Sequence, residues 1–489
     1  MTAPVRTTIP ADLETPVSVY LKLKDYMAAC HGGSAFLFES VERGVQMGRH
    51  SFIGLSAHTD IQLKAGQVRT QRADGTTGEV PVDPADPLGA VRAELAASPV
   101  AAAPTDKPLP PPFGGAVGYV GFDIVGYFEN IPLPGAAEKD LPDYRFMFPG
   151  TLVVFDHVKS EIEIITLPRG DAGAARQEID AILDALDQPL PHGSQRGKRR
   201  DGEQAGRLAD PIAGLEAEMD QGRFEAIVQE AREHILAGDA FQIVLSQRLQ
   251  GETSVEPFQV YRALRILNPS PYLFFLDFGE FQLIGSSPEM MVRLTDGHLQ
   301  VNPIAGTRPR GENIARDNEL AEDLLADEKE RAEHVMLVDL GRNDLGRVCE
   351  TGTVQVDEFM SVERYSHVMH LVSSVSGQLQ EGLDMFDALK ATFPAGTVSG
   401  APKIRAMEIL SRLEGLRRGP YAGAVGYFGV GGDMDMCITI RTLLMQGSRF
   451  RVQAGAGIVM DSDPTREYQE TLDKISALTR AVRIAEEEF

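Results

Sequence analysis

Apolar residues follow two different spacings along this chain of 489 residues. In its first third they form short alternating or continuous runs that end at glycine or charged residues, which is the pattern of β-strands. Strands are expected there at residues 35–39, 113–122, 152–156 and 161–166. Helical spacing in this part is limited to residues 174–186. The N-terminal region is therefore predicted to be rich in β-structure.

In the rest of the chain, helical and strand patterns interleave without the regular alternation that builds a parallel sheet. An aspartate cap followed by proline at Asp463-Pro464 indicates the start of a helix that runs toward the C-terminus. Further helices are expected at residues 223–237 and 316–340, and strands at residues 241–249, 272–277 and 281–286. This mixture predicts an α+β fold.

One break in composition divides the chain. Residues 187–210 are rich in Gly, Pro and charge and nearly empty of large apolar side chains, which is typical of a flexible linker. A chain of this length also exceeds what one hydrophobic core usually organises. We therefore predict an N-terminal region over residues 1–186 and a second domain over residues 211–489.

Composition limits the partners of the protein. Its 47 basic and 71 acidic residues give a net charge of −24, which would repel nucleic acids and anionic membranes. Cys30, Cys349 and Cys437 have neither metal-ligand nor disulfide spacing. No stretch resembles a signal peptide or a membrane span. A soluble, cytoplasmic protein is expected, with local groups holding any anionic substrate.

Three glutamates are candidate metal ligands. Glu333 lies on the helix expected at residues 316–340, and Glu467 and Glu470 are three residues apart on the last helix, so both share one face near its start. Carboxylates from two facing helices suit Mg²⁺, which takes a few carboxylates together with water and substrate oxygens. Spacing alone favours the alternative that these side chains simply face solvent.

Glycine clusters and isolated polar residues are further candidates. Clusters around Gly306, Gly396 and Gly455 can expose backbone N–H groups to an anion, although ordinary turns are the commoner use of glycine. His370 and Arg441 each interrupt an apolar run, as does Tyr427. A buried arginine needs an anionic partner, internal or bound. A lone histidine is more often a core residue, though histidine is the usual acid or base near neutral pH.

Seven long motifs follow one another in a fixed order in the second part of the chain. They are Gln242-Ile-Val-Leu-Ser-Gln-Arg, Asn268-Pro-Ser-Pro-Tyr, Gly285-Ser-Ser-Pro-Glu, Pro303-Ile-Ala-Gly-Thr-Arg-Pro-Arg-Gly, Glu333-His-Val-Met-Leu-Val-Asp-Leu-Gly-Arg-Asn-Asp, Gly396-Thr-Val-Ser-Gly-Ala-Pro-Lys and Gln453-Ala-Gly-Ala-Gly-Ile-Val. Together they resemble the family of chorismate-utilising enzymes over residues 218–478. This resemblance implies an α/β sandwich of two antiparallel sheets flanked by helices, with a β-rich regulatory region before it.

The resemblance implies a set of binding roles for the substrate chorismate. Mg²⁺ would bridge Glu333 and Glu470, with Glu467 nearby, to the ring carboxylate. Tyr427 and Arg441 would bind the enolpyruvyl carboxylate through charge-assisted hydrogen bonds. The remaining implied contacts are the backbone amides of Gly455, Ala456 and Gly457 at the ring carboxylate, and a turn formed by Gly306 and Thr307.

The resemblance also implies the chemistry. His370 would help the C4 hydroxyl to leave as water, and Glu289 would be the second acid or base. Gln242 stands where isochorismate and salicylate synthases carry a lysine that activates water, which favours ammonia as the nucleophile. Ala305 stands where aminodeoxychorismate synthases usually carry lysine, so this position is similar to the large subunits of anthranilate synthase. The implied reaction is ammonia addition at C2, loss of the C4 hydroxyl and elimination of pyruvate.

Ammonia would have to come from elsewhere, because no cysteine has the Gly-x-Cys-x-Gly surroundings of a glutamine amidotransferase. The resemblance therefore implies a separate amidotransferase subunit and a hetero-oligomer such as a heterotetramer. Two alternatives stay open. One is aminodeoxychorismate synthase component I, and the other is a non-catalytic protein that senses tryptophan.

An N-terminal motif is similar to the tryptophan feedback site of the family. It combines residues 37–40 and 48–54 with Pro271, Tyr272 and Leu273. Glu39 would pair with the ammonium group of the ligand, and Ser40 would hydrogen-bond to it. The alternative is that Glu39 ends a strand and Ser40 belongs to a turn. If the site is real, inhibition would be allosteric.

Overall fold

The computed structural model places most of the chain. It describes residues 3–29, 33–42, 46–98, 100, 108–135, 141–168, 172–191, 211–365 and 368–489. Cys30 lies outside these ranges, and the predicted linker is described only from residue 187 to residue 191.

Two large antiparallel sheets form the body of the protein, and each contains strands from both sides of the predicted linker. The first sheet has the strand order β1-β12-β11-β5-β2-β15-β16-β25-β26-β14-β13, with β22 also paired to β14. Its strands are β1 (Val5–Pro10), β2 (Ala35–Glu39), β5 (His50–Leu55), β11 (Thr151–Asp156), β12 (Glu161–Thr166), β13 (Glu216–Ala217), β14 (Gln242–Glu252), β15 (Tyr272–Asp277), β16 (Gln282–Ser287), β22 (Gly400–Ala401), β25 (Thr442–Gln446) and β26 (Arg449–Ile458).

The second sheet has the order β19-β21-β18-β17-β24-β23-β9-β10-β6-β7-β8, with β20 also paired to β21. Its strands are β6 (Thr59–Lys64), β7 (Gln67–Arg72), β8 (Thr77–Pro81), β9 (Ala116–Val120), β10 (Tyr144–Phe148), β17 (Met290–Thr295), β18 (His298–Val301), β19 (Ile304–Pro309), β20 (Gln355–Arg364), β21 (Val368–Gln378), β23 (Ala424–Phe428) and β24 (Met434–Ile438). A short hairpin, β3 (Val41–Glu42) and β4 (Gln46–Met47), stands apart from both sheets.

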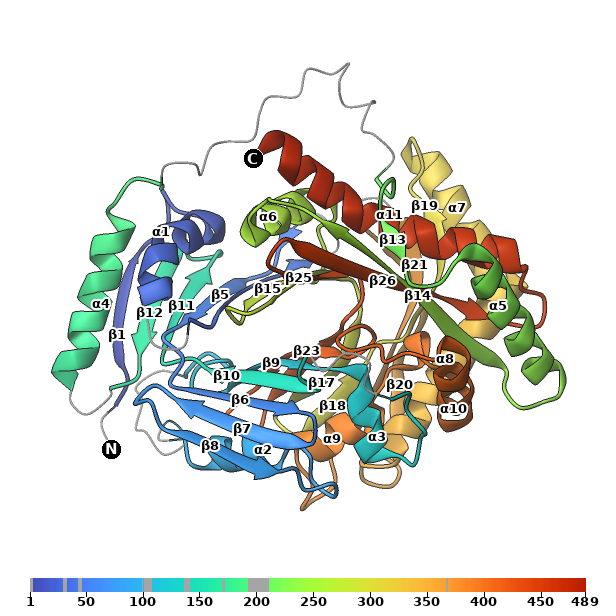
Figure 1. Cartoon of the computed structure of the whole chain (residues 1–489), viewed down its shortest axis with the longest axis horizontal. Helices are drawn as coiled ribbons and strands as arrows, with labels where there is room; N and C mark the ends of the chain where they lie inside the picture. Colours follow the sequence, from blue (N-terminus) through green and yellow to red (C-terminus); the bar gives the residue numbers. More distant parts are fainter. Residues whose placement is uncertain are drawn as a thin grey trace.

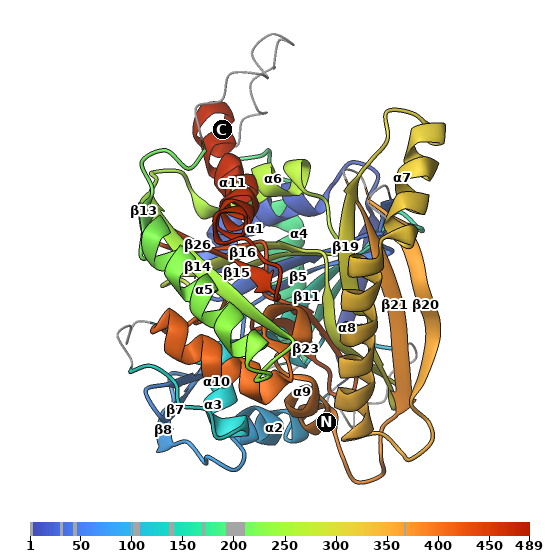
Figure 2. The same cartoon turned by 90° about the vertical axis from the view of Figure 1, so that its right-hand side faces the viewer.

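Helices cover the outer faces of the two sheets, so the expected α+β sandwich is confirmed (Figure 1). The long last helix crosses the first sheet, and Figure 2 shows two consecutive helices running beside β19, β21 and β20. The helices are α1 (Pro16–Ala29), α2 (Gly89–Ala96), α3 (Val125–Phe128), α4 (Ala172–Leu186), α5 (Gln221–Leu236), α6 (Pro257–Leu267), α7 (Ile314–Ala326), α8 (Glu328–Gly346), α9 (Met385–Thr392), α10 (Lys403–Glu414) and α11 (Pro464–Glu488), with short 3-10 turns at η1 (Phe122–Ile124) and η2 (Gly396–Val398). None of the helices in the described ranges is both long and apolar enough to cross a membrane.

The space between the sheets is filled by aromatic side chains from both parts of the chain. Phe36 and Tyr119 come from the N-terminal part, and Phe274 and Phe281 from the C-terminal part, and all four are at most 2% exposed. In the first sheet β2 pairs with β15, and in the second β9 pairs with β23. Residue 210 is therefore a boundary along the sequence but not between separately built sheets. The division into a regulatory and a catalytic region stays a prediction.

Most expected elements are found, and one is wrong. The helix expected at residues 316–340 is two helices, α7 and α8, which meet at Asp327. Asp327 ends α7 and caps α8, because its carboxylate accepts hydrogen bonds from the backbone N–H groups of Lys329 and Glu330 at 3.0 and 3.1 Å. Helical periodicity continues across this break, so the pattern of apolar residues did not reveal it.

Candidate active site

A cavity of about 260 Å³ brings most of the predicted site residues together. It lies between β14 and β26 of the first sheet and β19 and β21 of the second, and α8 and α11 supply further walls. The predicted residues that line it are Gln242, Glu289, Gly306, Thr307, Glu333, His370, Arg441, Gly455, Gly457 and Glu470. Glu467, Ala456 and Tyr427 do not line it.

Strand alternation explains which residues of β26 face the cavity. Gly455 and Gly457 line it, whereas the side chain of Ala456 is 1% exposed and packs in the hydrophobic core. Both glycines are closely approached: a Cβ at Gly455 would lie 2.8 Å from the carbonyl oxygen of Leu245, and one at Gly457 would lie 2.7 Å from Nε2 of Gln242. Glycine at these positions therefore makes room for the cavity floor.

Acidic side chains from α8 and α11 gather at one end of the cavity. Glu333 and Glu470 line it, and Glu330 precedes Glu333 by three residues just as Glu467 precedes Glu470. Burial, together with the charge of Glu333, raises the pKa of Glu330, and burial together with the charge of Glu470 raises that of Glu467. Glu330 was missed in the sequence, although it has the same spacing on its helix.

This end of the cavity suits a hard cation. Within the described residues no three His, Cys, Asp or Glu side chains are gathered closely enough to form a complete metal site. Mg²⁺, however, is usually bound by one or two carboxylates, with water and substrate oxygens completing its shell. Glu333 and Glu470 supply two such carboxylates, and the pKa values of Glu330 and Glu467 beside them are raised mainly by burial and in smaller part by the charges of Glu333 and Glu470, which a cation would offset.

Existing hydrogen bonds already orient these two carboxylates. Nε2 of Gln242 donates to Glu333 at 2.9 Å, and Nζ of Lys474 lies 2.7 Å from Glu470. Lys474 also donates to the carbonyl oxygen of Gly455 at 2.8 Å, which ties α11 to β26. Both carboxylates therefore face the cavity from fixed positions on separate helices.

Arg441 supplies positive charge at another part of the wall. It stands between β24 and β25 with a left-handed φ of 51°, an uncommon conformation for a residue other than glycine. Burial lowers the pKa of its guanidinium, against a smaller raising effect from Tyr421. In the described parts of the chain no carboxylate forms an ion pair with Arg441, so its charge is available to an anionic ligand.

Tyr421, rather than Tyr427, accompanies Arg441 in this cavity. The side chain of Tyr427 lines a different cavity, with Asp435 and Arg293 close enough to shift its pKa. Tyr421 was missed because it lies in a turn after Gly419-Pro420, where no strand pattern draws attention to it. The side chain that the resemblance paired with Arg441 is therefore placed elsewhere, and Tyr421 occupies the corresponding place.

Glu289 has a carboxyl group that is an unusually weak acid. Its side chain is buried, and Thr397 Oγ1 donates a hydrogen bond to it at 2.9 Å. Burial raises its pKa to about 8, although the bond from Thr397 opposes this. Glu289 is thus predominantly protonated at neutral pH and able to donate a proton.

His370, in contrast to Glu289, is suited to accept a proton. Burial lowers its pKa, although a hydrogen bond to Gly306 raises it in part. Nδ1 lies 2.8 Å from the carbonyl oxygen of Gly306, and because that oxygen can only accept, Nδ1 carries the hydrogen. His370 is therefore neutral, with Nε2 unprotonated and able to accept a proton.

A second cavity of about 490 Å³ contains all five residues of the predicted tryptophan site, namely Glu39, Ser40, Pro271, Tyr272 and Leu273. The carboxylate of Glu39 is turned toward α6, where it accepts hydrogen bonds from Tyr261 at 2.6 Å and from Arg265 at 2.8 and 3.0 Å. Its side chain is 0% exposed. The structure therefore does not present this carboxylate to a ligand ammonium group, and of the two polar residues Ser40 is the accessible one.

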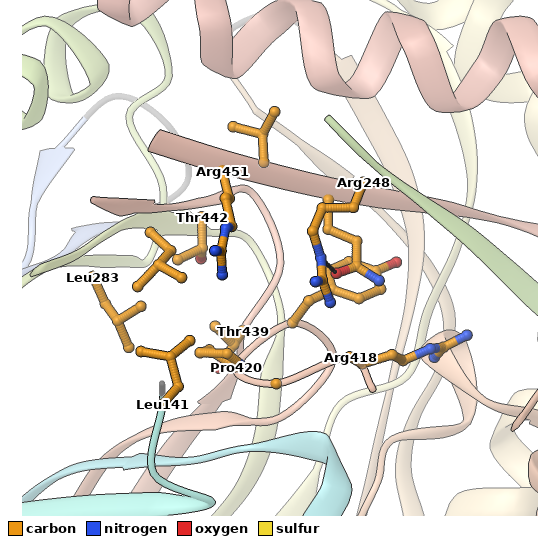
Figure 3. A pocket seen from close by; sticks show the side chains of 13 residues that line it. Leu141, Arg248, Leu283, Arg418, Pro420, Thr439, Thr442 and Arg451 are labelled. Atoms are coloured by element: carbon orange, nitrogen blue, oxygen red, sulfur yellow. Dashed lines mark hydrogen bonds between the residues drawn. The ribbon is translucent and has the colours of Figure 1, made fainter. Parts of the chain in front are cut away.

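A third, much smaller cavity of about 40 Å³ lies behind the first, and the two share Tyr421 and Gln453 as walls. The side chains of Arg248 on β14 and Arg451 on β26 point into it toward Thr439, whereas Arg418 points away (Figure 3). Arg248 donates to Gln453 at 3.0 Å. This space has room for a water-sized molecule only. We read it as part of the support for the active-site wall.

Similarity to known proteins identifies the family of this chain. A sequence profile of the family described as chorismate binding enzyme matches residues 40–480. "Anthranilate synthase component 1" of Thermus thermophilus is 46% identical, covering 99% of this chain and 98% of its own length. The protein of the same name from Acetivibrio thermocellus is 42% identical, covering 99% of this chain and 96% of its own.

Solved structures give the same picture. The crystal structure of anthranilate synthase component I from Streptococcus pneumoniae superposes with a TM-score of 0.76 at 40% identity, covering 88% of this chain and 92% of that one. The menaquinone-specific isochorismate synthase MenF of Escherichia coli superposes with a TM-score of 0.70 at 21% identity, covering 98% of this chain and 94% of that one, a likeness of fold alone.

Proposed function

The chain belongs to the chorismate-binding enzymes, and from this premise we propose that it converts chorismate and ammonia to anthranilate and pyruvate for tryptophan biosynthesis. One observation carries the proposal. The cavity of 260 Å³ is lined by a pair of carboxylates from two helices, Glu333 and Glu470, and by Arg441, a half-buried cation with which no carboxylate of the described residues forms an ion pair. Such a cavity suits a ligand with two carboxylates.

Each substrate carboxylate has a partner of its own. Arg441 and Tyr421 would bind the enolpyruvyl carboxylate by charge-assisted hydrogen bonds, and desolvation of Arg441 would strengthen that contact. Glu333 and Glu470 would hold Mg²⁺, which supplies positive charge to the ring carboxylate when it is bound. Without that charge the acidic end of the cavity would repel the substrate.

The protonation states divide the proton transfers between two residues. We assign the proton that leaves with the C4 hydroxyl to Glu289, because its carboxyl is protonated at neutral pH. Neutral His370 would accept the proton that is removed before pyruvate leaves, because its Nε2 is unprotonated. The resemblance had linked His370 to the departing hydroxyl.

The nucleophile is taken to be ammonia because the cavity offers no base at residue 242. Gln242 is neutral, and its amide already donates to Glu333. Ala305 contributes only a methyl group to the wall, so no lysine engages the substrate there. These two side chains favour anthranilate over isochorismate and aminodeoxychorismate as the product.

The proposal extends to partners and regulation. A separate glutamine amidotransferase subunit would supply ammonia within a hetero-oligomer in the cytoplasm, and ammonium salts would replace it in vitro. The second cavity would bind tryptophan as an inhibitor, since it joins aromatic and aliphatic walls to polar groups such as Ser40 and Tyr272.

The deciding experiment mixes the purified chain with chorismate, Mg²⁺ and ammonium chloride and follows anthranilate by its fluorescence. We expect anthranilate and pyruvate in equal amounts, and loss of both when Mg²⁺ is chelated. Glu470→Ala should lose this Mg²⁺-dependent turnover while still binding tryptophan, which also separates an enzyme from a sensor without catalysis. A non-aromatic amino product without pyruvate would instead identify an aminodeoxychorismate synthase.

A further inference from the structure

The active-site cavity and the second cavity share a wall. Pro288 and Ile304 line both of them. The residue after Pro288 is Glu289, and two residues after Ile304 is Gly306, whose carbonyl oxygen accepts the hydrogen bond from His370 at 2.8 Å. Both proposed proton-transfer groups are therefore attached to the wall between the active site and the second cavity.

Two further residues of the second cavity reach His370 from behind. Tyr365 packs against His370 with ring centroids 5.6 Å apart at an angle of 62°. The hydroxyl of Tyr365 donates to Glu363 at 2.8 Å, and Glu363 is the cross-strand neighbour of His370 in the β20–β21 pair. Tyr365 and Glu363 both line the second cavity, whereas His370 lines the active site.

This arrangement restrains the imidazole of His370, whose Nδ1 also lies 3.2 Å from the hydroxyl of Thr307. The hydrogen bond at Nδ1 fixes one edge of His370, and the ring of Tyr365 limits rotation about that edge. The negative charge of Glu363 also acts on the imidazole and favours its charged form. A displaced Tyr365 would thus change both the direction of Nε2 and the charge near it.

We propose that Tyr365, held by Glu363, is a positioning residue for His370, and that a ligand in the second cavity inhibits the enzyme by moving this pair. The inference rests on the proposed function of both cavities. The probe is L-tryptophan, whose indole is large enough to compete for the space beside Tyr365.

The test compares Tyr365→Phe and Glu363→Gln with the wild type in steady-state kinetics. Tyr365→Phe removes the hydrogen bond, whereas Glu363→Gln keeps an acceptor oxygen but removes its negative charge, and both changes keep the shape of the side chain. We expect kcat to fall about 10-fold while KM for chorismate changes less than about 2-fold, because the pair touches the proton acceptor and not the substrate. The tryptophan concentration for half-inhibition should rise at least about 10-fold.

Calorimetry supplies the second readout, because both variants should still bind tryptophan with heat and stoichiometry close to those of the wild type. Glu358→Gln is the matched control, since Glu358 lies on the same strand with an exposed side chain. It should leave kcat and inhibition unchanged. Tyr365→Ala tests the ring itself, and thermal unfolding shows whether it folds; if it does not, Tyr365→Phe still decides.

The outcomes separate this inference from the proposed function. A wild type that makes no anthranilate refutes the proposed function. The positioning role is overturned if the wild type makes anthranilate and both Tyr365→Phe and Glu363→Gln match it in kcat and in inhibition by tryptophan. A wild type that tryptophan does not inhibit overturns the ligand effect, while kcat of the variants still decides the positioning role.

Discussion

At the scale of single residues, this active site depends on burial more than on composition. The sequence marks Glu289 by a motif and His370 by an interrupted apolar run, but it is burial in the fold that raises the pKa of the first and lowers that of the second. The carboxyl group with a raised pKa can donate a proton and the imidazole with a lowered pKa can accept one, both near neutral pH. Neither state is a property of the residue type, because both arise from the loss of water.

The proposed role of Glu289 as the general acid is testable through the pH dependence of kcat. Glu289 must be protonated to donate, so kcat should fall as pH rises through its pKa of about 8. Glu289→Gln should lower kcat at neutral pH by about 10²-fold and remove that limb of the pH profile. Thr397→Val removes the bond that lowers the pKa of Glu289, so its limb should move to higher pH. An unchanged limb in Glu289→Gln would assign the titration to another group.

The two cavity glycines of β26 also predict different outcomes. Gly455→Ala would press a Cβ against the backbone of Leu245, which cannot yield, and should lower the free energy of unfolding by about 1–3 kcal/mol. Gly457→Ala meets only the mobile end of Gln242, so it should unfold like the wild type. Its KM for chorismate should rise, since Gln242 would be displaced from Glu333. Denaturant unfolding and steady-state kinetics check both, and equal stability of the two variants would contradict the close contact at Leu245.

At the scale of elements, two capped helix starts precede the proposed metal ligands. Glu330 and Glu333 follow the cap of α8 at Asp327, and Glu467 and Glu470 follow the cap of α11 at Asp463. The positive partial charge at a helix start acts within the first turn, so it favours the carboxylates of Glu330 and Glu467. The break between α7 and α8 therefore does more than turn the chain, because it places a helix start beside the cavity.

Removal of the cap of α8 and removal of the cap of α7 should lower stability to a similar extent but differ in their effect on Mg²⁺ dependence. Asp327→Ala loses the two backbone hydrogen bonds and the bond from Arg308 at 2.8 Å, and should lower the free energy of unfolding by about 1 kcal/mol or more. Asn313→Ala removes the cap of α7, which accepts from Arg316 at 3.0 Å, at a similar cost. When activity is titrated with Mg²⁺, the Mg²⁺ concentration that gives half-maximal activity should rise for Asp327→Ala and not for Asn313→Ala. Equal shifts in both variants would argue against a special role for the start of α8.

At the scale of the whole molecule, the two sheets unite sequence regions that composition separates. Strands β2 and β5 extend the first sheet beyond β15, and β9 and β10 extend the second beyond β23. The active-site cavity and the second cavity both lie between these two sheets. The two cavities are therefore neighbours through shared sheets as well as through the wall at Pro288 and Ile304.

This architecture predicts that the C-terminal part is not independent. Residues 211–489 expressed alone should lack a cooperative thermal transition and chorismate turnover, because β15 would lose β2 and β23 would lose β9 as a partner strand, and Phe274 and Phe281 would be exposed. Co-expression with residues 1–191 should restore both, since the two pieces together contain every strand of the sheets. A folded, active fragment 211–489 would show instead that the predicted domain boundary is a structural one.

The sequence by itself determined the local elements, the family motifs and the chemistry available. The strands at residues 35–39, 161–166 and 272–277 and the helix after Asp463 followed from periodicity and capping, which act over a few residues. Only the tertiary structure decided that Tyr421 rather than Tyr427 joins Arg441, that Glu39 is engaged by Arg265, and that burial raises the pKa of Glu289. These results depend on which distant segments meet and on how much water they exclude, and no local pattern encodes either.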